Sequence, residues 1–455
     1  MVTEVPNLEA DFGIEAYASE SLGINGRIRS LPEDFIVEEV LIDGSKASVN
    51  AADIKSLSSG RGRYIICVLI KKDWDTFAAV RAIAHQISVD PDRINIAGIK
   101  DARALTAQHI SIGGVPLEKV LGVHLENARV IPTCFSSDKI SSKVLFGNQF
   151  DIMVRSVNYS TEEVRQRIED TRNNLEIFGG VPNFFGHQRF GTIRPFTHKV
   201  GRCIVKGELE EAALIFLSEP SIHEHRRSAR ARERLRETRD YRDCLRFFPR
   251  RLVYERLMLL HLSKNQNDFL GAFRQLPRTL RVLFIQAYQS YLFNRFLSER
   301  MKHGLSLTEA SLGDYVVILD ENGLPSDIFK KTESNQVSEI NEAIGKKQMA
   351  ISLPLVGFNQ GVSDGAQGQI EKNILEEEGV CPEDFSLKEM PDASAAGGLR
   401  NVLTPLLNFD VVIDENDLNQ NNLVVRFRFM LHKGSYATVV LREFMKPSDL
   451  VEAGF

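Results

Sequence analysis

Residues 97–112 read AGIKDARALTAQHISI. Two segments combine apolar with β-branched side chains and are expected to be strands. They are residues 94–97, which lead into this stretch, and residues 107–112, which end it. The loop between them contains Gly98, which permits a close approach of the backbone, and the acidic residue Asp101. The sequence therefore predicts a carboxylate held in a short loop between two strands.

The side chains around Asp101 are suited to chemistry as well as to a turn. Lys100 precedes it, and Thr106 and Gln108 follow with a hydroxyl and an amide at alternate positions. A carboxylate with such neighbours can act as a nucleophile or as a proton acceptor. The alternative is a β-turn in which Asp101 caps its own backbone, which is a common structural use of aspartate.

Outward from this loop, the first 190 residues alternate between predicted strands and helices. Residues 63–71 (RYIICVLIK) are apolar and β-branched, which suits a buried strand. A helix is expected to begin after Asp75 as its N-cap, with Phe77, Val80, Ile83, Ala84 and Ile87 at helical spacing. Further extended segments are expected at 26–29, 34–40 and 145–154, and an amphipathic helix at 161–178.

From about residue 195 to 300 the pattern changes to long, charged helices, of which the apolar segment 283–296 is expected to be buried. Residues 359–400 are rich in Gly, Ser, Asp and Glu and are predicted to be a loop. Predicted strands return after residue 400 and need partners, so the simplest architecture is a discontinuous domain of strands and helices, interrupted by a mostly helical insertion. The late strands are expected at 409–413, 422–431 and 436–441, the last two joined by a hairpin-like turn at 432–435.

Composition and charge exclude several classes of protein. The chain has 455 residues and a formal net charge of −5, from 56 Lys and Arg against 61 Asp and Glu. No apolar run approaches the roughly 18 residues that a membrane helix needs, and the acidic N-terminus does not resemble a signal peptide. The five cysteines include no Cys-x-x-Cys pair, so neither a disulfide framework nor a zinc ribbon is supported. A cytoplasmic protein is therefore expected.

An arginine-rich segment departs from this acidic average. Residues 221–256 carry 12 arginines against six acidic residues. Such a cluster can contact RNA phosphates, and the alternative is a solvated helix stabilised by ion pairs. The arginines expected to contact phosphates are Arg226, Arg227, Arg230 and Arg234.

Two further segments combine aromatic and polar side chains. Residues 179–191 read GGVPNFFGHQRFG, in which the rings could stack on unpaired bases and Asn183 could read a base edge. The alternative is a glycine-rich loop that its phenylalanines anchor in the core. Residues 27–39 read RIRSLPEDFIVEE, where Arg27 and Arg29 would share one face of a strand. On its own, this last pattern is typical of a solvated strand edge.

Together, and in their order along the chain, the segments 27–39, 97–112 and 179–191 resemble the TruD family of tRNA pseudouridine synthases. The family pattern around the catalytic aspartate is Gly-x-Lys-Asp followed by Thr-x-Gln, which matches residues 98–108 here. The resemblance spans nearly the whole chain, and five ordered matches are far more specific than any one of them. The other matches are Pro32–Val37, Val181–Gly191, Gln289–Asn294 (QSYLFN), and Gly-Ser-Tyr-Ala-Thr with Arg-Glu within 434–443.

The resemblance implies both a fold and an activity. The implied fold is α+β, with a discontinuous pseudouridine synthase catalytic domain in residues 1–194 and 406–455, built on a mixed, mainly antiparallel sheet with helices. A large, mainly helical insertion in residues 195–405 interrupts this domain, and the molecule is expected to be V-shaped with a cleft. The implied activity is the isomerisation of uridine to pseudouridine in tRNA, typically at position 13. The glycosidic bond is broken, and the rotated base is rejoined through carbon 5.

The resemblance also assigns roles to residues. Asp101 corresponds to the catalytic aspartate, and Arg29, Phe35, Asn183 and Phe185 are implied to bind the substrate uridine. Bacterial relatives have a lysine in place of Arg29, so the positive charge is kept but the planar guanidinium has a different geometry. An arginine near the catalytic carboxylate would favour its charged form. Supporting roles are expected for Lys100, Thr106, Gln108 and Arg189.

Because substrate and product are isomers, tRNA is the expected partner, and no metal, nucleotide or other cofactor is expected. The sequence has no P-loop or dinucleotide motif, and His223-x-His225 is more typical of a surface than of a metal site. One alternative is a non-catalytic RNA-binding or RNA-folding module on the same fold, against which the intact Asp101 argues. Another is an Asp-nucleophile phosphatase or hydrolase, but this loop lacks the paired aspartates that Mg²⁺-dependent phosphotransfer needs.

Overall fold

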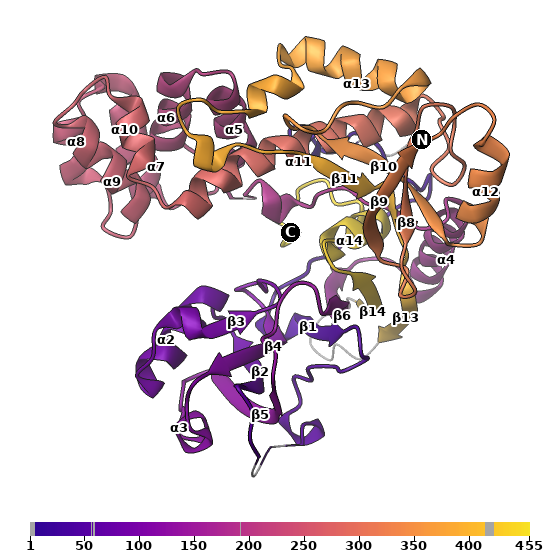
Figure 1. Ribbon diagram of the computed structural model, residues 1–455, viewed down its shortest axis with the longest axis horizontal. Coiled ribbons are helices and arrows are strands. Elements are labelled where there is room, and N and C mark those ends of the chain that lie inside the picture. The colour runs from indigo at the N-terminus through magenta and orange to yellow at the C-terminus, as the bar shows by residue number, and fades with distance from the viewer. Residues whose placement is uncertain (1–4, 56, 58–59, 192, 415–422) are drawn as a thin grey trace.

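The computed structural model describes residues 5–55, 57, 60–191, 193–414 and 423–455. Two lobes diverge from a shared base and give the molecule the expected V shape (Figure 1). One lobe carries N-terminal strands with helices α2 (Thr76–Ile87) and α3 (Leu117–Leu121). The other lobe consists of the segment that interrupts the sheet.

One large sheet forms the base and the first lobe. Its eight strands run in the order β13-β14-β6-β1-β4-β2-β5, and β3 pairs with β4 outside this path. Among the described strands only β1 and β4 pair in parallel, so the sheet is mixed and mainly antiparallel, as predicted. The strands are β1 (Phe35–Leu41), β2 (Tyr64–Lys72), β3 (Ile94–Ile96), β4 (Leu105–Gly113), β5 (Ala128–Ser136), β6 (Leu145–Val157), β13 (Leu407–Asp414) and β14 (Leu423–His432).

The late strands complete the N-terminal sheet. β14 pairs with β6 from Leu423 opposite Val157 to His432 opposite Gly147, and β13 pairs with β14 on the outer side. The prediction that the late strands find partners in the first part of the chain is therefore confirmed. Asn422, the first residue of one predicted strand, lies outside the described residues, and the exact domain boundaries at 194 and 405 stay predictions.

Helix α2 follows the predicted start signal. The side chain of Asp75 accepts a hydrogen bond from the Ala78 amide at 2.9 Å, which caps the helix. Val80, Ile83 and neighbouring apolar residues of α2 are buried against β2 and β4. Phe77 was expected on the same face, but it is 48% exposed, so that part of the prediction is wrong.

Residues 436–441, predicted to be a strand, belong instead to the helix α14 (Ala437–Met445), so the predicted hairpin is wrong. The stretch read as a strand, residues 437–441, is short, apolar and rich in β-branched side chains, and all residues of α14 are buried. Such a run cannot be told from a strand by pattern alone. Residues 432–435 therefore join a strand to a helix.

The interrupting segment combines a helical layer with a small sheet. The apolar segment 283–296 lies within α11 (Arg278–Lys302), the longest helix described, and most of its residues are buried, as predicted. The small sheet has the order β11-β10-β8-β9. Its strands are β8 (Tyr315–Leu319), β9 (Pro325–Lys331), β10 (Met349–Leu355) and β11 (Gly398–Asn401), and the helices are α5 (Thr197–Val205), α6 (Leu209–Ser218), α7 (Arg226–Thr238), α8 (Tyr241–Phe247), α9 (Val253–Leu262), α10 (Phe269–Arg274) and α12 (Val337–Gly345).

Residues 359–400 were predicted to be a loop, but they contain helix α13 (Gly365–Glu378) and strand β11. Ile370, Ile374 and Leu375 give α13 a narrow buried face. Gly379 ends the helix in the left-handed conformation, with φ of 64°. The polar composition hid this helix because only a narrow face of it is apolar.

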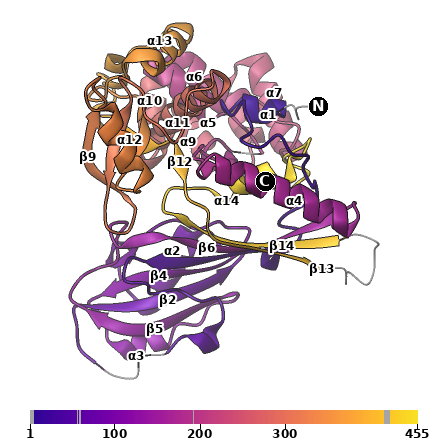
Figure 2. The ribbon, with the colours of Figure 1, turned by 90° about the vertical axis from the view of Figure 1, so that its right-hand side faces the viewer.

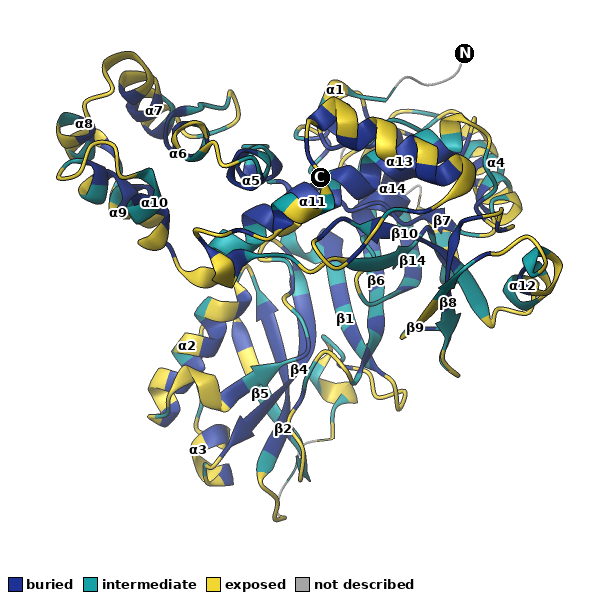
Figure 3. Ribbon diagram, turned by 45° about the horizontal axis from the view of Figure 1, so that its top comes forward, coloured by how far each residue is buried: buried dark blue, intermediate teal, exposed yellow. Residues whose placement is uncertain are grey.

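The main apolar core connects the two parts of the chain. It includes Phe427 of β14, Phe444 of α14 and Phe293 of α11, whereas a separate cluster lies beneath α2. Figure 2 shows α4 (Thr161–Ile177) and α14 between the large sheet and the interrupting segment. Figure 3 shows that buried residues concentrate in the sheet and in α14. Helix α14 thus joins the base of the molecule to the second lobe. Short elements that complete the chain are α1 (Asn7–Ala10), β7 (Val181–Pro182) and β12 (Leu403–Thr404).

Candidate active site

A pocket of about 470 Å³ contains Asp101 and collects segments that are far apart in the sequence. Four of the predicted motifs contribute to it, represented by Phe35, Asp101, Gln188 and Tyr436. The segment before α14 supplies a further wall. We refer to this cavity as the Asp101 pocket, and its main lining residues are Phe35, Val37, Gly98–Ala102, Leu145, Asn148, Phe150, Gln188 and Gly434–Thr438.

Asp101 is paired with Arg29 in this pocket. Arg29 Nη2 donates to Asp101 Oδ2 at 3.2 Å, and the two side chains are 10% and 35% exposed, respectively. The guanidinium also lies 4.0 Å from the centre of the Phe35 ring, and Nη1 donates to the Gly454 carbonyl at 3.0 Å. The structure therefore brings together three predicted site residues: the carboxylate, its cationic partner and an aromatic ring.

Arg29 is held in an unusual way. Its φ of 54° lies in the left-handed region, which a residue with a side chain adopts at a cost of about 1–3 kcal/mol. Burial lowers the pKa of Arg29 from its ordinary value, and the Asp101 carboxylate acts against this effect. Contacts on both sides, to Asp101 and to Gly454, maintain the strained conformation.

The loop that carries Asp101 is fixed by a buried lysine that the sequence analysis did not identify. Lys71 Nζ donates to the carbonyl oxygens of Asp101 and Trp74, both at 2.8 Å. Burial lowers the pKa of Lys71 to about 8, although the carboxylates of Asp101 and Asp75 act against this shift. The available signal was the pair Lys71-Lys72 at the end of an apolar strand. Lys71 joins the loop to the start of α2.

Two of the predicted supporting residues, Lys100 and Gln108, act on the loop rather than on the carboxylate. Lys100 Nζ donates to Glu39 Oε1 at 2.6 Å in a buried ion pair, and Gln108 Nε2 donates to the Gly98 carbonyl at 3.1 Å. The hydroxyl of Thr106 is buried and makes no hydrogen bond with any described residue. Lys100 and Gln108 thus fix residues 98–100, immediately before Asp101.

Asn183 lies behind the wall of the Asp101 pocket and does not line it. Arg400 Nη2 donates to Asn183 Oδ1 at 2.7 Å and to the Gly434 carbonyl at 2.9 Å. The Ser435 hydroxyl also donates to Asn183 Oδ1, at 3.3 Å. Asn183 therefore connects β11, which carries Arg400, to the pocket-lining segment before α14. No feature of the sequence singled out Arg400.

Phe185 also lies one layer behind the pocket. Its ring contacts that of Tyr436, which lines the pocket, at a centroid distance of 6.1 Å. The Arg400 guanidinium lies 4.0 Å from the centre of the Phe185 ring, and that of Arg189 lies 5.5 Å away. Arg189 Nε in turn donates to the Ser290 hydroxyl at 3.1 Å. Tyr436 is therefore the aromatic residue next to the pocket in this part of the structure. Tyr436 belongs to the motif Gly-Ser-Tyr-Ala-Thr, but the sequence did not indicate a role for it.

The arginine-rich segment separates into structural and exposed members. Arg226, Arg227 and Arg230 are exposed on α7, whereas Arg234 pairs with Asp243 at 2.6 Å. Arg232, which was not predicted as a phosphate contact, is buried and pairs with glutamates of the same lobe. Exposed arginines, which phosphate contacts would require, and ion pairs therefore occur in the same helix, and phosphate binding stays a prediction.

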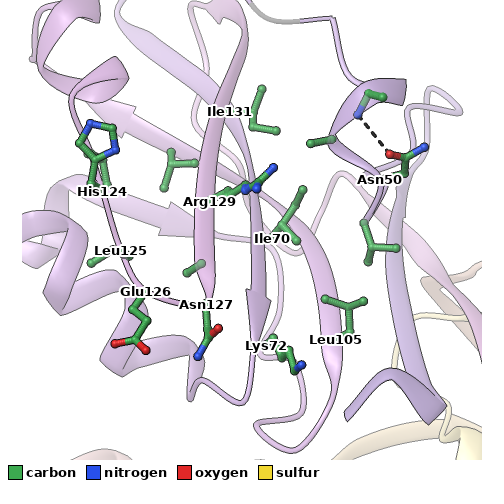
Figure 4. A pocket seen from close by; sticks show the side chains of 16 residues that line it. Asn50, Ile70, Lys72, Leu105, His124, Leu125, Glu126, Asn127, Arg129 and Ile131 are labelled. Carbon is green, nitrogen blue, oxygen red and sulfur yellow. Dashed lines mark hydrogen bonds between the residues drawn. The ribbon is translucent and has the colours of Figure 1, made fainter. Parts of the chain in front are cut away.

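A larger hollow of about 1190 Å³ lies against β2 and β5, where Figure 4 shows Lys72, His124 and Arg129. It shares no lining residue with the Asp101 pocket. Among the described residues, no group of His, Cys, Asp and Glu side chains is arranged to hold a metal ion. No helix in the same part of the chain is long and apolar enough to span a membrane.

Comparisons with known proteins agree over nearly the full length of the chain. The family model for tRNA pseudouridine synthase D (TruD) matches residues 11–444. A probable tRNA pseudouridine synthase D of Methanosarcina barkeri is 40% identical over 450 residues, which cover 98% of this chain and 99% of the relative. A protein of the same description from Thermococcus sibiricus is 37% identical over 435 residues, covering 94% of this chain and 97% of the relative.

A solved structure is similar as well. The crystal structure of a putative tRNA pseudouridine synthase D from Methanosarcina mazei matches with a TM-score of 0.80 at 37% sequence identity. The match covers 97% of this chain and 98% of that chain. The similarity therefore includes the interrupting segment as well as the large sheet.

Proposed function

The chain belongs to the TruD family of tRNA pseudouridine synthases, and we propose that it converts uridine 13 of tRNA to pseudouridine with Asp101 as the catalytic carboxylate. The resemblance inferred from the motifs is confirmed by the match over residues 11–444. At the level of the family, the protein is a tRNA pseudouridine synthase, an isomerase. The position in the tRNA and the roles of individual residues are our proposal. We also propose that the enzyme meets its tRNA in the cytoplasm.

The pairing of Asp101 with Arg29 carries the proposal. A carboxylate that reacts with a ribose must be ionised and must reach the substrate, and Asp101 meets a guanidinium at 3.2 Å while 35% of its side chain stays exposed. A structural aspartate in a tight turn would instead cap its own backbone. The carboxylate of Asp101 faces a cation and a pocket, which favours the catalytic interpretation.

The reaction needs one carboxylate and a closed space for the detached base. The bond between ribose C1′ and uracil N1 breaks, the base rotates, and C1′ bonds to C5. The proton of C5 is lost and N1 gains one, so the product is an isomer. Asp101 either attacks the ribose or removes a proton, and Arg29 stabilises its charge in both routes. Phe35 and Tyr436 line the pocket and are suited to hold the base while it rotates.

Asn183 and Phe185 support this pocket from behind. Arg400 holds both the amide of Asn183 and the ring of Phe185, and Phe185 packs against Tyr436. The resemblance implies that Asn183 and Phe185 bind the uridine. We propose that they do so indirectly, by positioning Ser435 and Tyr436, which line the pocket. For tRNA phosphates, the exposed arginines of α7 are the proposed contacts, which are Arg226, Arg227, Arg230 and, despite its ion pair, Arg234.

The test is to map pseudouridine in tRNA incubated with wild type and with Asp101→Asn. We expect pseudouridine at position 13 with wild type and essentially none with the variant, because the amide is neither a nucleophile nor a base. Equal activity of both proteins would remove Asp101 from the reaction. Binding of tRNA without modification by wild type would instead support the alternative function, an RNA-binding or RNA-folding module.

A further inference from the structure

A second pocket of about 300 Å³ lies next to the Asp101 pocket, between α11 and the segment that leads into β11. The two cavities share no lining residue. Its volume lies at the lower end of the roughly 300–1,000 Å³ typical of ligand sites. A site of this size suits one flat ring system. The residues that line this second pocket include Phe185, Arg189, Ile285, Gln286, Gln289 and Leu355.

A thin wall separates the two pockets. Tyr436 lines the Asp101 pocket and Phe185 lines the second pocket, and their ring centroids are 6.1 Å apart. The adjacent residues Gln188 and Arg189 repeat this arrangement, because Gln188 lines the first pocket and Arg189 the second. The wall is one pair of rings thick, so neighbouring nucleotides of one RNA strand could occupy both pockets.

The second pocket offers polar groups that the protein leaves free. Arg189 donates its Nε to Ser290, and its terminal nitrogens donate to no described residue. Gln289 Nε2 donates to the Val356 carbonyl at 2.6 Å, which fixes the amide, while its oxygen accepts no hydrogen bond within the described part of the chain. Gln286 adds a second, exposed amide. Arginine and amide side chains are those that read the edges of bases.

Apolar residues complete the walls of the second pocket. Ile285, Leu355 and the ring of Phe185 are buried or half-buried beside the polar groups. The backbone at Gly397 closes the opposite side with φ of 88°, and a Cβ there would lie 2.7 Å from the Leu355 carbonyl. An aromatic ring next to amide and guanidinium groups is typical of sites for unpaired bases.

We propose that the second pocket binds an unpaired nucleobase that flanks the target uridine in the same RNA strand. This inference rests on the proposed function, in which the target nucleotide leaves its stack. The departing uridine deprives its neighbours of a stacking partner, and a pocket for one neighbour offsets that cost. The second pocket would therefore position the RNA strand across the wall and contribute to the choice of uridine.

The inference can be tested with matched changes in protein and RNA. The RNA substrates are tRNAs with a single abasic site at each of the two positions before and after the target uridine. The protein variant is Gln286→Leu, which removes an exposed amide without changing the buried core, and the matched control is Gln369→Leu on the exposed face of α13. The measured quantity is kcat/KM for pseudouridine formation by every protein with every RNA.

For one flanking position, we expect the abasic site to lower kcat/KM of wild type about tenfold. Gln286→Leu should lose a similar factor on the intact tRNA and little more on that abasic tRNA, because both changes remove the same contact. The control Gln369→Leu should respond to every RNA as wild type does. A second variant, Ala396→Phe, fills the pocket and should reproduce the loss seen with Gln286→Leu.

Two outcomes would overturn the inference. Either no flanking abasic site matters to wild type, or the losses from Gln286→Leu and the abasic site multiply at every position. Both leave the proposed function intact as long as wild type forms pseudouridine and Asp101→Asn does not. Absence of pseudouridine with wild type would instead contradict the proposed function itself.

Discussion

Replacement of Arg29 by methionine removes the cation that pairs with Asp101 and keeps an unbranched side chain. The contact of 3.2 Å is longer than the roughly 2.7–2.9 Å of a strong charged hydrogen bond. Such a bond contributes about 1.5–3 kcal/mol, and solvent reduces this value here because the Asp101 side chain is 35% exposed. We therefore expect the pair to contribute about 1–2 kcal/mol.

If this free energy acts in the transition state, kcat/KM for Arg29→Met falls by roughly 5–30-fold. The loss should appear mainly in kcat, because Arg29 orients and stabilises the reacting carboxylate rather than the distant parts of the tRNA. Arg29→Lys should retain part of the activity. Its ammonium can keep the charge, but it cannot reproduce the fork that contacts both Asp101 and Gly454.

The assay is single-turnover pseudouridine formation at saturating enzyme, combined with unfolding in urea to check that the fold persists. Arg27→Met is the matched control, since Arg27 is exposed and only two residues away. Full activity of Arg29→Met would refute the reasoning, because Asp101 would then not need its cation. A loss as complete as that of Asp101→Asn, in a folded protein, would also refute it, since Arg29 would then take part directly in the chemistry.

Three further perturbations have defined outcomes. Arg400→Met should lower kcat by about tenfold with a smaller change in KM, because it removes the contacts that hold Asn183 and Phe185 behind the Asp101 pocket. An effect on KM alone in steady-state kinetics would contradict this. Burial lowers the pKa of His198 to about 3. Below pH 6.5 the unfolded chain therefore binds a proton that the folded chain does not, and the free energy of unfolding decreases as the pH is lowered. His198→Phe should therefore lose less stability than wild type between pH 7 and 5, by about 2 kcal/mol in urea unfolding, and parallel curves would disprove the assignment. Arg226→Ala with Arg230→Ala should weaken tRNA binding and flatten its dependence on salt, measured by filter binding, whereas an unchanged slope would exclude these arginines as phosphate contacts.

Local signals in the sequence were sufficient for most of the large sheet. The strand at 63–71 and the helix after Asp75 are where their patterns placed them, because β-branched runs and capping residues act over a few positions. The helices α13 and α14 were missed for opposite reasons. Helix α13 shows too little apolar periodicity, whereas α14 begins with a short, apolar and β-branched run that suits a strand as well as a buried helix.

The part of the candidate site that the sequence predicts is the part carried by local motifs. Asp101 and Arg29 were identified from their motifs, and the structure brings them within 3.2 Å of each other. Lys71 and Arg400 were missed because each acts through contacts with distant segments. Their importance depends on which carbonyl or ring lies next to them in three dimensions, and no local pattern carries that information.

The position of Arg29 links the candidate site to the C-terminal end of the described chain. The Ile28 amide donates to the Ala453 carbonyl at 2.9 Å, and Arg29 itself donates to the carbonyl of Gly454. A Cβ at Gly454 would lie 2.2 Å from the Ile28 carbonyl, so the two segments are in close contact. Arg29 and Asp101 lie before the interrupting segment in the chain, whereas Gly454, which also holds the Arg29 side chain, lies after it. The surroundings of the charged pair are therefore complete only when both parts of the chain have come together.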